Sequence, residues 1–373
     1  MNRPKSIDLH MMGKEMKLGI IGSAGVPNRY GGFESFLEHC GPVLSRKTKA
    51  IYVTCDASLY QDDLSAQYLG MNRVFISVKA NGVFSIIHDL IAFLRIYRNS
   101  THIMVLGVSG GLWFPFFKLM CYWGDKRLGV NIDGVEWRRS KFNNIKKQVL
   151  RFFDYLAQRF SDVVVYDNAG LAPYIYSFSR GRSVGIGYSG DHVIRNNWQC
   201  VKGTALTICR IEPENNLDML IEGMMRSRLS HYTIVGNWNN SEYGRALRKS
   251  YQFECRLLML DPIYEPNRLA ELRESCAVYL HGHSVGGTNP SLVEMLYYDC
   301  VLCCYDVIFN RVTAGECANY FRNVDELVQC INAIVDNNFI RIDEHNRDAI
   351  RSKYTSEVIA AAYIEAMSGQ SCQ

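Results

Sequence analysis

Residues 17–34 read KLGIIGSAGVPNRYGGFE, and this stretch decides the fold. An apolar run, 18–21, ends in a glycine-rich turn, and a helical pattern begins near Glu34 and continues to Leu44. A second apolar run follows at 50–54. A short buried strand, a glycine turn, a helix and another strand are typical of the unit from which parallel α/β sheets are built. The opening therefore predicts an α/β domain with a parallel sheet.

The alternation of strands and helices continues and then begins again. After the opening unit we expect a strong helix at 145–160 and apolar strands at 74–78, 102–106, 128–132 and 162–166. Turn residues gather at 185–191, and a second series runs from 205 to a helix at 324–335. These patterns predict two α/β domains, 16–190 and 191–355, and a final helix, 356–367, that packs back on the first domain. Two such domains facing each other would enclose a central cleft, with ligands bound beyond the carboxyl ends of the strands.

Composition places the chain among globular proteins. Of its 373 residues, 48% are hydrophobic and 21% are charged, which excludes a disordered chain. A formal charge of +4 is too balanced to indicate nucleic acid as a partner. The thirteen cysteines are scattered and no secretory signal precedes them, so we expect reduced thiols in the cytoplasm. No run reaches the roughly 18 apolar residues that span a bilayer.

The turn after the first strand is longer than a tight turn requires. The residues of interest in it are Gly25, Arg29, Tyr30, Gly31 and Gly32. Glycines let the backbone approach a ligand closely, and the start of the following helix favours negative charge, so one interpretation is a phosphate-bearing ligand. The alternatives are a merely structural turn and a dinucleotide site in which Asp56, at the end of the second strand, meets a ribose.

Residues 131–139 read NIDGVEWRR and lie just past a predicted strand end. The segment holds two carboxylates three residues apart, Asp133 and Glu136, followed by Arg138 and Arg139. At the carboxyl end of a strand such carboxylates would face the cleft, where they could orient a hydroxyl or act as acid or base. A solvated loop with ion pairs is the alternative.

Residues 281–294 read HGHSVGGTNPSLVE. The pattern predicts a strand end, a glycine turn, and a helix capped by Thr288 or Asn289 with Pro290 in its first turn. Free N–H groups at such a helix start suit a phosphate, and a glutamate one turn further on suits sugar or ribose hydroxyls. The candidate donor-binding residues here are Gly286, Gly287, Thr288, Asn289, Ser291 and Glu294. A metal held by the two histidines is an alternative, although no third ligand follows at a suitable spacing.

Residues 208–216 read ICRIEPENN, again a strand end followed by a turn, with Arg210 placed to meet a phosphate. No Asp-x-Asp occurs in the chain. The carboxylate pair that commonly holds a divalent ion against the diphosphate of a nucleotide sugar is therefore missing. We expect a phosphate site that needs no metal.

Taken together, the four segments resemble the GT-B glycosyltransferases of family four, and more closely the bacterial rhamnosyltransferase-like branch used in O-antigen and capsule assembly. The matching residues are 25–34, 133–139, 210–216 and 282–294, in order over nearly the whole chain. The resemblance implies the GT-B fold, in which two Rossmann-like parallel-sheet domains face a central cleft. It also implies transfer of a sugar from a nucleotide diphosphate to a hydroxyl, with retention of configuration and without a metal or other cofactor.

The resemblance also implies roles for residues of the second domain. Arg210 would bind the diphosphate, and Asn215 stands where the wider family has a lysine. Glu294 matches the second of two family glutamates, while Gly286 replaces the first. That replacement gives His283 a catalytic role by proximity.

In the first domain, Gly31 and Gly32 would line the cleft near the diphosphate or the acceptor. Asp133 and Glu136 would lie near the reacting sugar, which makes them the other candidate catalytic residues. The charge that develops on the leaving diphosphate would be stabilised by Arg210 and by the helix N-terminus after Asn289. A diphosphate oxygen would itself take the proton of the acceptor, so no nucleophilic carboxylate is required.

The expected donor is dTDP-L-rhamnose, and the expected acceptor is a saccharide linked to polyprenyl diphosphate. A cytoplasmic protein peripheral on the inner face of the cytoplasmic membrane would meet that acceptor. The aromatic run 112–123 and the cations Lys141, Lys146, Lys147 and Arg151 could touch an anionic membrane. A buried helix and a solvated basic helix face are the alternative interpretations of these two features.

Three further interpretations of the function stay open. The donor could be a UDP- or GDP-hexose, with the same class of reaction. The protein could be an NAD-dependent oxidoreductase or epimerase of sugar nucleotides, favoured by the glycine turn and Asp56. It could also bind saccharides without turnover, given the departures at Gly286 and Asn215.

Overall fold

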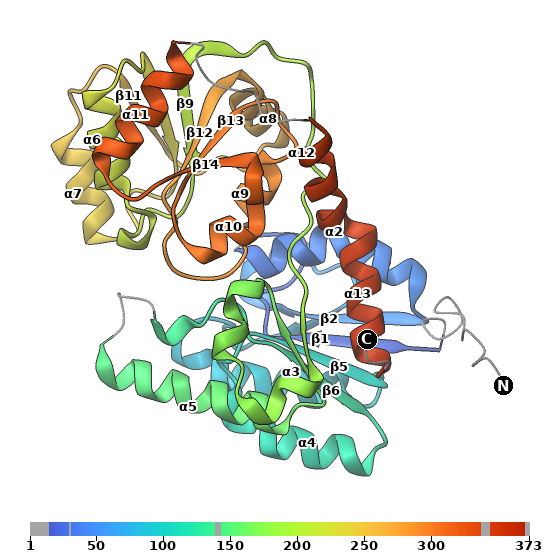
Figure 1. Ribbon diagram of the computed structural model, residues 1–373. Coiled ribbons are helices and arrows are strands. Elements are labelled where there is room, and N and C mark those ends of the chain that lie inside the picture. The colour runs from blue at the N-terminus through green and yellow to red at the C-terminus, as the bar shows by residue number, and fades with distance from the viewer. Residues whose placement is uncertain (1–14, 30, 139–142, 337–343, 370–373) are drawn as a thin grey trace, which may run out of the picture. The chain divides into compact units, whose positions relative to one another are not determined.

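The computed structural model describes residues 15–29, 31–138, 143–336 and 344–369 (Figure 1). Contacts divide the chain into two compact units. The first unit runs through Ser189 and takes up the chain again from Ser356, and the second unit is Gly190–Thr355. The sequence places a boundary near residue 190, where the alternation restarts. Each unit is described by itself below.

The first unit is built on an eight-stranded sheet in the order β3-β4-β2-β1-β5-β6-β7-β8. All neighbouring strands are parallel except β3 and β4, which are antiparallel. The strands are β1 (Lys17–Ile21), β2 (Ala50–Asp56), β3 (Gln67–Tyr68), β4 (Met71–Ile76), β5 (His102–Leu106), β6 (Arg127–Asn131), β7 (Val163–Tyr166) and β8 (Ser183–Gly185).

Helices cover both faces of this sheet (Figure 1). From β1 the chain passes to β2 on one side in the sheet, and from β4 it passes to β5, β6 and β7 on the other side. Because these crossovers are right-handed, the two directions place the connecting helices on opposite faces of the sheet. One face carries α2 (Gly32–Lys47) and α13 (Ser356–Ser368), and the other carries α3 (Ser85–Tyr97), α4 (Phe114–Trp123) and α5 (Asn144–Phe160). No helix in the described ranges is both long and apolar enough to reach across a bilayer.

The C-terminal helix α13 is part of the core of the first unit. Tyr363 packs its ring against Phe36 of α2, with the ring centroids 4.8 Å apart, and Asn131 Nδ2 donates to its hydroxyl over 2.7 Å. Glu357 at the start of α13 lies 2.9 Å from Nζ of Lys47, at the end of α2. This helix therefore supports the end of β6, where Asn131 is located.

The second unit contains a six-stranded parallel sheet in the order β11-β10-β9-β12-β13-β14. Its strands are β9 (Val201–Ile208), β10 (His231–Val235), β11 (Leu257–Leu260), β12 (Cys276–His281), β13 (Val301–Tyr305) and β14 (Ala318–Phe321). Its helices are α6 (Leu217–Arg226), α7 (Glu242–Ser250), α8 (Pro266–Ser275), α9 (Pro290–Met295), α10 (Ile308–Ala314), α11 (Val324–Val335) and α12 (Glu344–Arg351). The predicted α/β class with two parallel-sheet domains is confirmed.

The elements differ from the prediction in a few places. The strand expected at 74–78 lies at Met71–Ile76. Beyond its end, the carbonyl oxygen of Val78 lies 2.7 Å from Nδ1 of His88 instead of joining the sheet. The short strands β3, β8 and β14 and the helix α10 were not predicted.

Candidate functional site

Two loops of the second unit are locked together beyond neighbouring strands. The strands β9 and β12 pair in parallel, so the loops that follow them leave the same edge of the sheet. The N–H and the hydroxyl of Ser284 donate to the carbonyl of Glu214 over 2.9 and 2.8 Å, and Asn216 Nδ2 donates to the carbonyl of Gly282 over 2.8 Å. The structure therefore brings together the segments 210–216 and 282–294, which are far apart in the sequence.

Asn215 holds the ring of His283 in this pair of loops. The amide nitrogen of Asn215 donates to the carbonyl of Arg210 over 2.7 Å, and its amide oxygen lies 2.9 Å from His283 Nδ1. With that orientation of the amide, His283 Nδ1 carries a proton and donates, and in the neutral ring Nε2 is the proton acceptor. Both polar ends of the Asn215 amide are thus engaged inside the protein, at the position where the sequence resemblance implies a lysine.

Gly286 fits its position because His283 occupies the space beside it. Its φ of +134° is one that side-chain-bearing residues rarely adopt, and a Cβ there would lie 2.9 Å from His283 Nε2. A glutamate at this position would have to displace the ring. Glycine at position 286 and the ring of His283 are therefore two parts of one local arrangement.

The buried carboxylate of Glu294 is held by an arginine and a histidine. Arg273, from α8, donates through Nη2 to Oε2 of Glu294, and His192 Nε2 lies 3.3 Å from Oε1. Burial opposes the charged form of Arg273, but the charge of Glu294 and the nearby Tyr298 together raise the pKa of the guanidinium. Removing one partner from a buried ion pair costs about 3–5 kcal/mol. The carboxylate of Glu294 is accordingly held in one position.

Arg273 and His192 were not among the residues singled out from the sequence. Arg273 lies within an ordinary helical pattern, and His192 follows the turn between the two predicted domains. Their contacts with Glu294 span 21 and 102 residues of chain. Nothing in the local sequence indicates such a contact.

The start of α9 partly contradicts the expected phosphate site. Asn289 is the cap, as predicted, and its side chain accepts the N–H of Ser291 over 3.0 Å. The N–H groups of Leu292 and Val293 donate to the carbonyl of Asn289 over 3.0 and 3.2 Å. These three N–H groups are therefore engaged and not open to a phosphate. The helix has only six residues, so its dipole contributes little there.

The remaining candidate residues of the second unit differ in exposure. Gly287 and Thr288 are buried, Ser291 is half-buried, and Arg210 is exposed just beyond β9. The Arg210 guanidinium makes no ion pair with a carboxylate of the described residues. It is therefore the cation of these loops that is open to a ligand phosphate.

Glu214 is a functional candidate that the sequence reasoning missed. It is buried in the turn after β9, and neither of its carboxylate oxygens has a hydrogen-bond partner among the described residues. Burying a carboxylate without a partner lowers stability. In the sequence, Arg210 stands out as a cation and Asn215 as a departure from the pattern that the segment resembles, whereas a glutamate in a turn gives no separate signal.

In the first unit, the glycine turn and the end of β6 meet around two carboxylates. Glu34, in the first turn of α2, is buried and accepts the N–H of Ala24 over 2.6 Å. Burial raises the pKa of Glu34, and the nearby charge of Asp133 raises it further. Asp133, at a φ of +55°, accepts the hydroxyl of Tyr188 over 3.5 Å. Glu34, which the sequence marked only as a helix start, therefore holds the glycine turn at Ala24.

The glycine turn itself is tightly packed. A Cβ on Gly25, whose φ is +114°, would lie 2.6 Å from Cys55 Sγ at the end of β2. Gly31 is the N-terminal cap of α2, and Gly32 is its first residue. Close packing of the turn against a neighbouring strand accounts for Gly25 without a ligand.

Arg29, Tyr30 and Glu136 complete the candidates of the first unit. Arg29 donates to both carboxylate oxygens of Asp62 over 2.6 and 2.7 Å and also to the carbonyl of Leu59, so its charge is paired within the unit. Tyr30 lies outside the described residues. Glu136 begins a short 3-10 helix, Glu136–Arg138, and its side chain is also outside the described part of the chain.

Asp56 is the residue that would bind the ribose if the glycine turn were a dinucleotide site. Its carboxylate accepts the N–H and hydroxyl of Ser58 over 3.0 and 2.7 Å and the N–H of Ala80 over 2.8 Å. It is buried at the end of β2. These three protein donors account for the carboxylate of Asp56 within the first unit, without a ribose.

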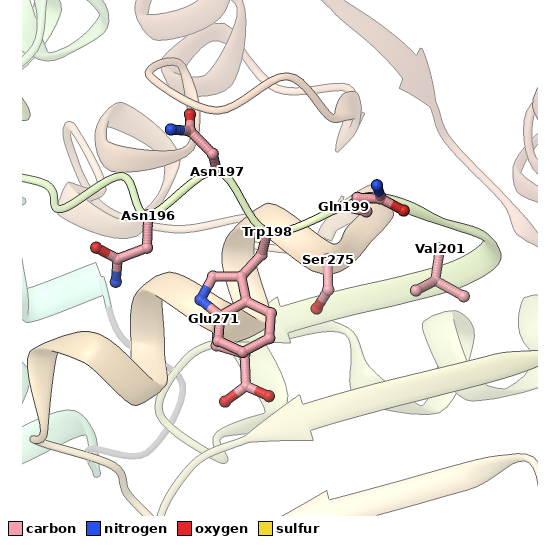
Figure 2. A pocket seen from close by; sticks show the side chains of 7 residues that line it. All are labelled: Asn196, Asn197, Trp198, Gln199, Val201, Glu271 and Ser275. Atoms are coloured by element: carbon pink, nitrogen blue, oxygen red, sulfur yellow. The ribbon is translucent and has the colours of Figure 1, made fainter.

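Elsewhere, an open pocket lies near the amino end of β9 (Figure 2). The carboxylate of Glu274 accepts the backbone N–H groups of Asn196, Asn197 and Trp198, which fixes the loop from which the indole projects. The pocket is lined by Asn196, Asn197, Trp198, Gln199, Val201, Glu271 and Ser275. None of the candidate site residues lines it. Within the described ranges, no group of three or more His, Cys, Asp or Glu is placed to hold a metal ion.

Comparison with known proteins gives a family model for the first half and a fold for the whole chain. Residues 16–191 match a family described as a domain of unknown function, DUF1972. No curated protein matches the chain. Many solved structures match the chain.

Three solved structures have low sequence identity to this chain, but each matches it in structure over nearly its full length. Sucrose-phosphate synthase from Thermosynechococcus elongatus has a TM-score of 0.70 at 10% identity, covering 94% of this chain and 97% of its own. The catalytic domain of starch synthase IV from Arabidopsis thaliana, bound to ADP and acarbose, has a TM-score of 0.67 at 10% identity, covering 95% and 99%. The lipopolysaccharide outer core galactosyltransferase WaaB has a TM-score of 0.61 at 12% identity, covering 94% and 99%. The chain has the GT-B fold that these structures share.

Proposed function

We propose that this protein is a glycosyltransferase that moves a sugar from a nucleotide diphosphate to a hydroxyl of an acceptor. The observation that carries the proposal is the arrangement at the carboxyl edge of the second sheet. There an exposed cation, Arg210, and two interlocked loops lie within a unit that also fixes the buried carboxylate of Glu294. Ligands of open α/β sheets bind beyond this edge.

In the proposed donor site each group has a distinct role. Arg210 binds the diphosphate and stabilises the charge that develops on it as the sugar leaves. Glu294, held by Arg273 and His192, accepts hydrogen bonds from hydroxyls of the ribose or the sugar. The segment 286–288 forms the wall of the site, where glycines allow the backbone close to the ligand. The role of Asn215 is to hold His283.

The proposed reaction retains the configuration of the sugar and uses no metal. As the bond from the anomeric carbon to the diphosphate breaks, the acceptor oxygen bonds to that carbon, and its proton passes to a diphosphate oxygen. Asp133, Glu136 and His283 are the proposed catalytic residues, which orient the sugar and the acceptor hydroxyl. His283 suits this because Asn215 fixes the proton on Nδ1 and leaves Nε2 as acceptor.

The finer assignment of substrates rests on the sequence resemblance. We propose dTDP-L-rhamnose as the donor and a polyprenyl-diphosphate-linked saccharide as the acceptor, in the assembly of a bacterial O-antigen or capsule at the inner face of the cytoplasmic membrane. One of the structures with a similar fold is that of a lipopolysaccharide outer core galactosyltransferase, which agrees with such a role.

Nucleotide binding tests the donor site before any acceptor is known. Melting curves with dTDP, UDP, GDP and NAD are expected to show a rise with one nucleoside diphosphate, since a ligand at about 100 times its Kd stabilises a fold by roughly 2.7 kcal/mol. A rise with UDP or GDP instead of dTDP would keep the reaction and change the sugar. A rise with NAD alone would overturn the proposal.

Variants assign that binding to the proposed site. Arg210→Ala is expected to abolish the nucleotide-dependent rise without lowering the melting temperature of the free protein, because the side chain is exposed. Arg248→Ala is the control, a half-buried arginine of the same unit that is paired with Asp261. An equal loss in both variants would show that the effect does not come from the proposed site.

A further inference from the structure

The helix α4 presents an apolar stripe to solvent. Leu112, just before the helix, and Phe116, Leu119 and Trp123 follow each other at spacings of four, three and four residues, which places them on one side of a helix. All are exposed, Trp123 to 71%, and the neighbouring Tyr122 to 75%. The opposite side of α4, with Phe117 and Cys121, is buried in the core. The helix is therefore apolar on both sides.

The helix α5 repeats this arrangement. Ile145, Val149, Phe152 and Tyr155 are exposed at spacings of four, three and three residues, Ile145 to 77%. Its opposite side packs into the core of the first unit through Leu150, Phe153 and Ala157. A helix of a protein that met only water would carry polar residues on its outer side.

A third stripe lies on α3 and the turn before it, where Val83, Phe84, Ile87 and Leu94 are exposed. The three helices are neighbours on one face of the first sheet (Figure 1). Phe93 of α3 stacks on Phe117 of α4 with the ring centroids 4.0 Å apart. Gly111, ahead of α4, lies so close to Phe153 of α5 that a Cβ would be 2.6 Å from its Cα.

Positive charge is concentrated in the same part of the chain. Residues 83–160 contain twelve lysines and arginines against five acidic residues, although the whole chain has a formal charge of only +4. Lys146, Arg151 and Arg159 of α5 are exposed, beside or within its apolar stripe. Apolar side chains flanked by cations suit the surface of an anionic bilayer, where the rings enter the headgroup region and the cations meet phosphate.

We propose that α3, α4 and α5 together form a docking surface for an anionic phospholipid bilayer. A second copy of the chain is a poorer occupant, because two such surfaces would bring like charges together. The contact is peripheral, with the rings at headgroup depth. The inference deepens the proposed function, because this surface would bring the protein to a lipid-linked acceptor, but the docking itself does not depend on catalysis.

Vesicle flotation of the full chain tests the proposal. Binding is expected to vesicles of mixed phosphatidylglycerol and phosphatidylcholine and to be much weaker to phosphatidylcholine alone. The double variant Trp123→Ser/Phe152→Ser is expected to bind about tenfold more weakly, since it removes two inserted rings. Lys146→Gln/Arg151→Gln should lose about fivefold per cation. Phe253→Ser is the control, because Phe253 is 91% exposed in the second unit.

Several results would overturn the docking surface. These are no binding to the anionic vesicles, equal binding to both kinds of vesicle, unchanged binding by the Trp123→Ser/Phe152→Ser variant, or an equal loss with Phe253→Ser. If light scattering shows that the parent protein is a dimer and that the Trp123→Ser/Phe152→Ser variant is a monomer, the surface binds a second copy of the chain instead. Melting curves confirm that each variant is folded. Because flotation needs no substrate, failed docking and failed sugar transfer are separate results.

Discussion

Glu294 depends on side chains that are distant from it in the sequence. Its carboxylate is buried, and burying a carboxylate lowers stability unless cations or donors replace the water it has lost. Arg273 and His192 supply that replacement. The position of Glu294 could be predicted because it closes a motif with a glycine turn and a helix cap. Its partners could not, since Arg273 comes from α8 and His192 from the segment before β9, and only the tertiary fold brings them near.

Arg273→Ala is expected to leave Glu294 buried and unpaired on that side. The free energy of unfolding in urea should fall by about 3–5 kcal/mol, and the nucleotide should bind more weakly. Arg268→Ala is the matched control on the same helix, because Arg268 makes an exposed pair with Glu271 and should change stability by less than about 1 kcal/mol. Equal losses of stability in the two variants would contradict the role given to Arg273.

At the scale of the elements, the strands with long apolar runs were the predictable ones. β5 begins and ends at the expected residues, His102–Leu106. β3 has two residues and β8 has three, too few for an alternation of polar and apolar side chains to be recognised. The phosphate site expected at the start of α9 fails for another reason, because the cap itself uses the N–H groups.

The helix α3 carries a buried carboxyl that makes stability depend on pH. Burial raises the pKa of Asp89 to about 7, against the opposing effect of the Gly110 N–H. The unfolded chain ionises near the ordinary value of about 4, so between about pH 4 and pH 7 it binds fewer protons than the folded protein. Stability from this group is therefore full below about pH 4 and falls as pH rises toward 7.

Asp89→Asn is expected to remove that loss. At pH 8 the variant should be more stable than the parent by up to about 4 kcal/mol, whereas at pH 4 the two should be alike. Urea unfolding at the two pH values measures the difference. A variant that is destabilised equally at both would show that Asp89 acts through its hydrogen bond and not through its charge.

At the scale of the whole molecule, the chain returns to its first unit at the end. α13 fills the face of the first sheet beside α2, and its Tyr363 accepts a hydrogen bond from Asn131 at the end of β6. A chain cut after Thr355 would expose that apolar face, so we expect the first unit to lose cooperative unfolding. A chain that lacks only 370–373 is the control. Cooperative unfolding of the shorter chain at an unchanged temperature would contradict this dependence.

Transfer of a sugar to an acceptor tests the proposed function most directly. A polyprenyl-diphosphate-linked saccharide is incubated with the protein and with dTDP-L-rhamnose, a UDP-hexose or a GDP-hexose, and its mass is then measured by mass spectrometry. We expect the acceptor to gain the mass of one sugar with one donor, and Glu294→Gln and Arg210→Ala to lose this product while Arg248→Ala keeps it. Nucleotide binding without any gain in mass, across all donors, would contradict a transferase and favour a protein that binds saccharides without turnover.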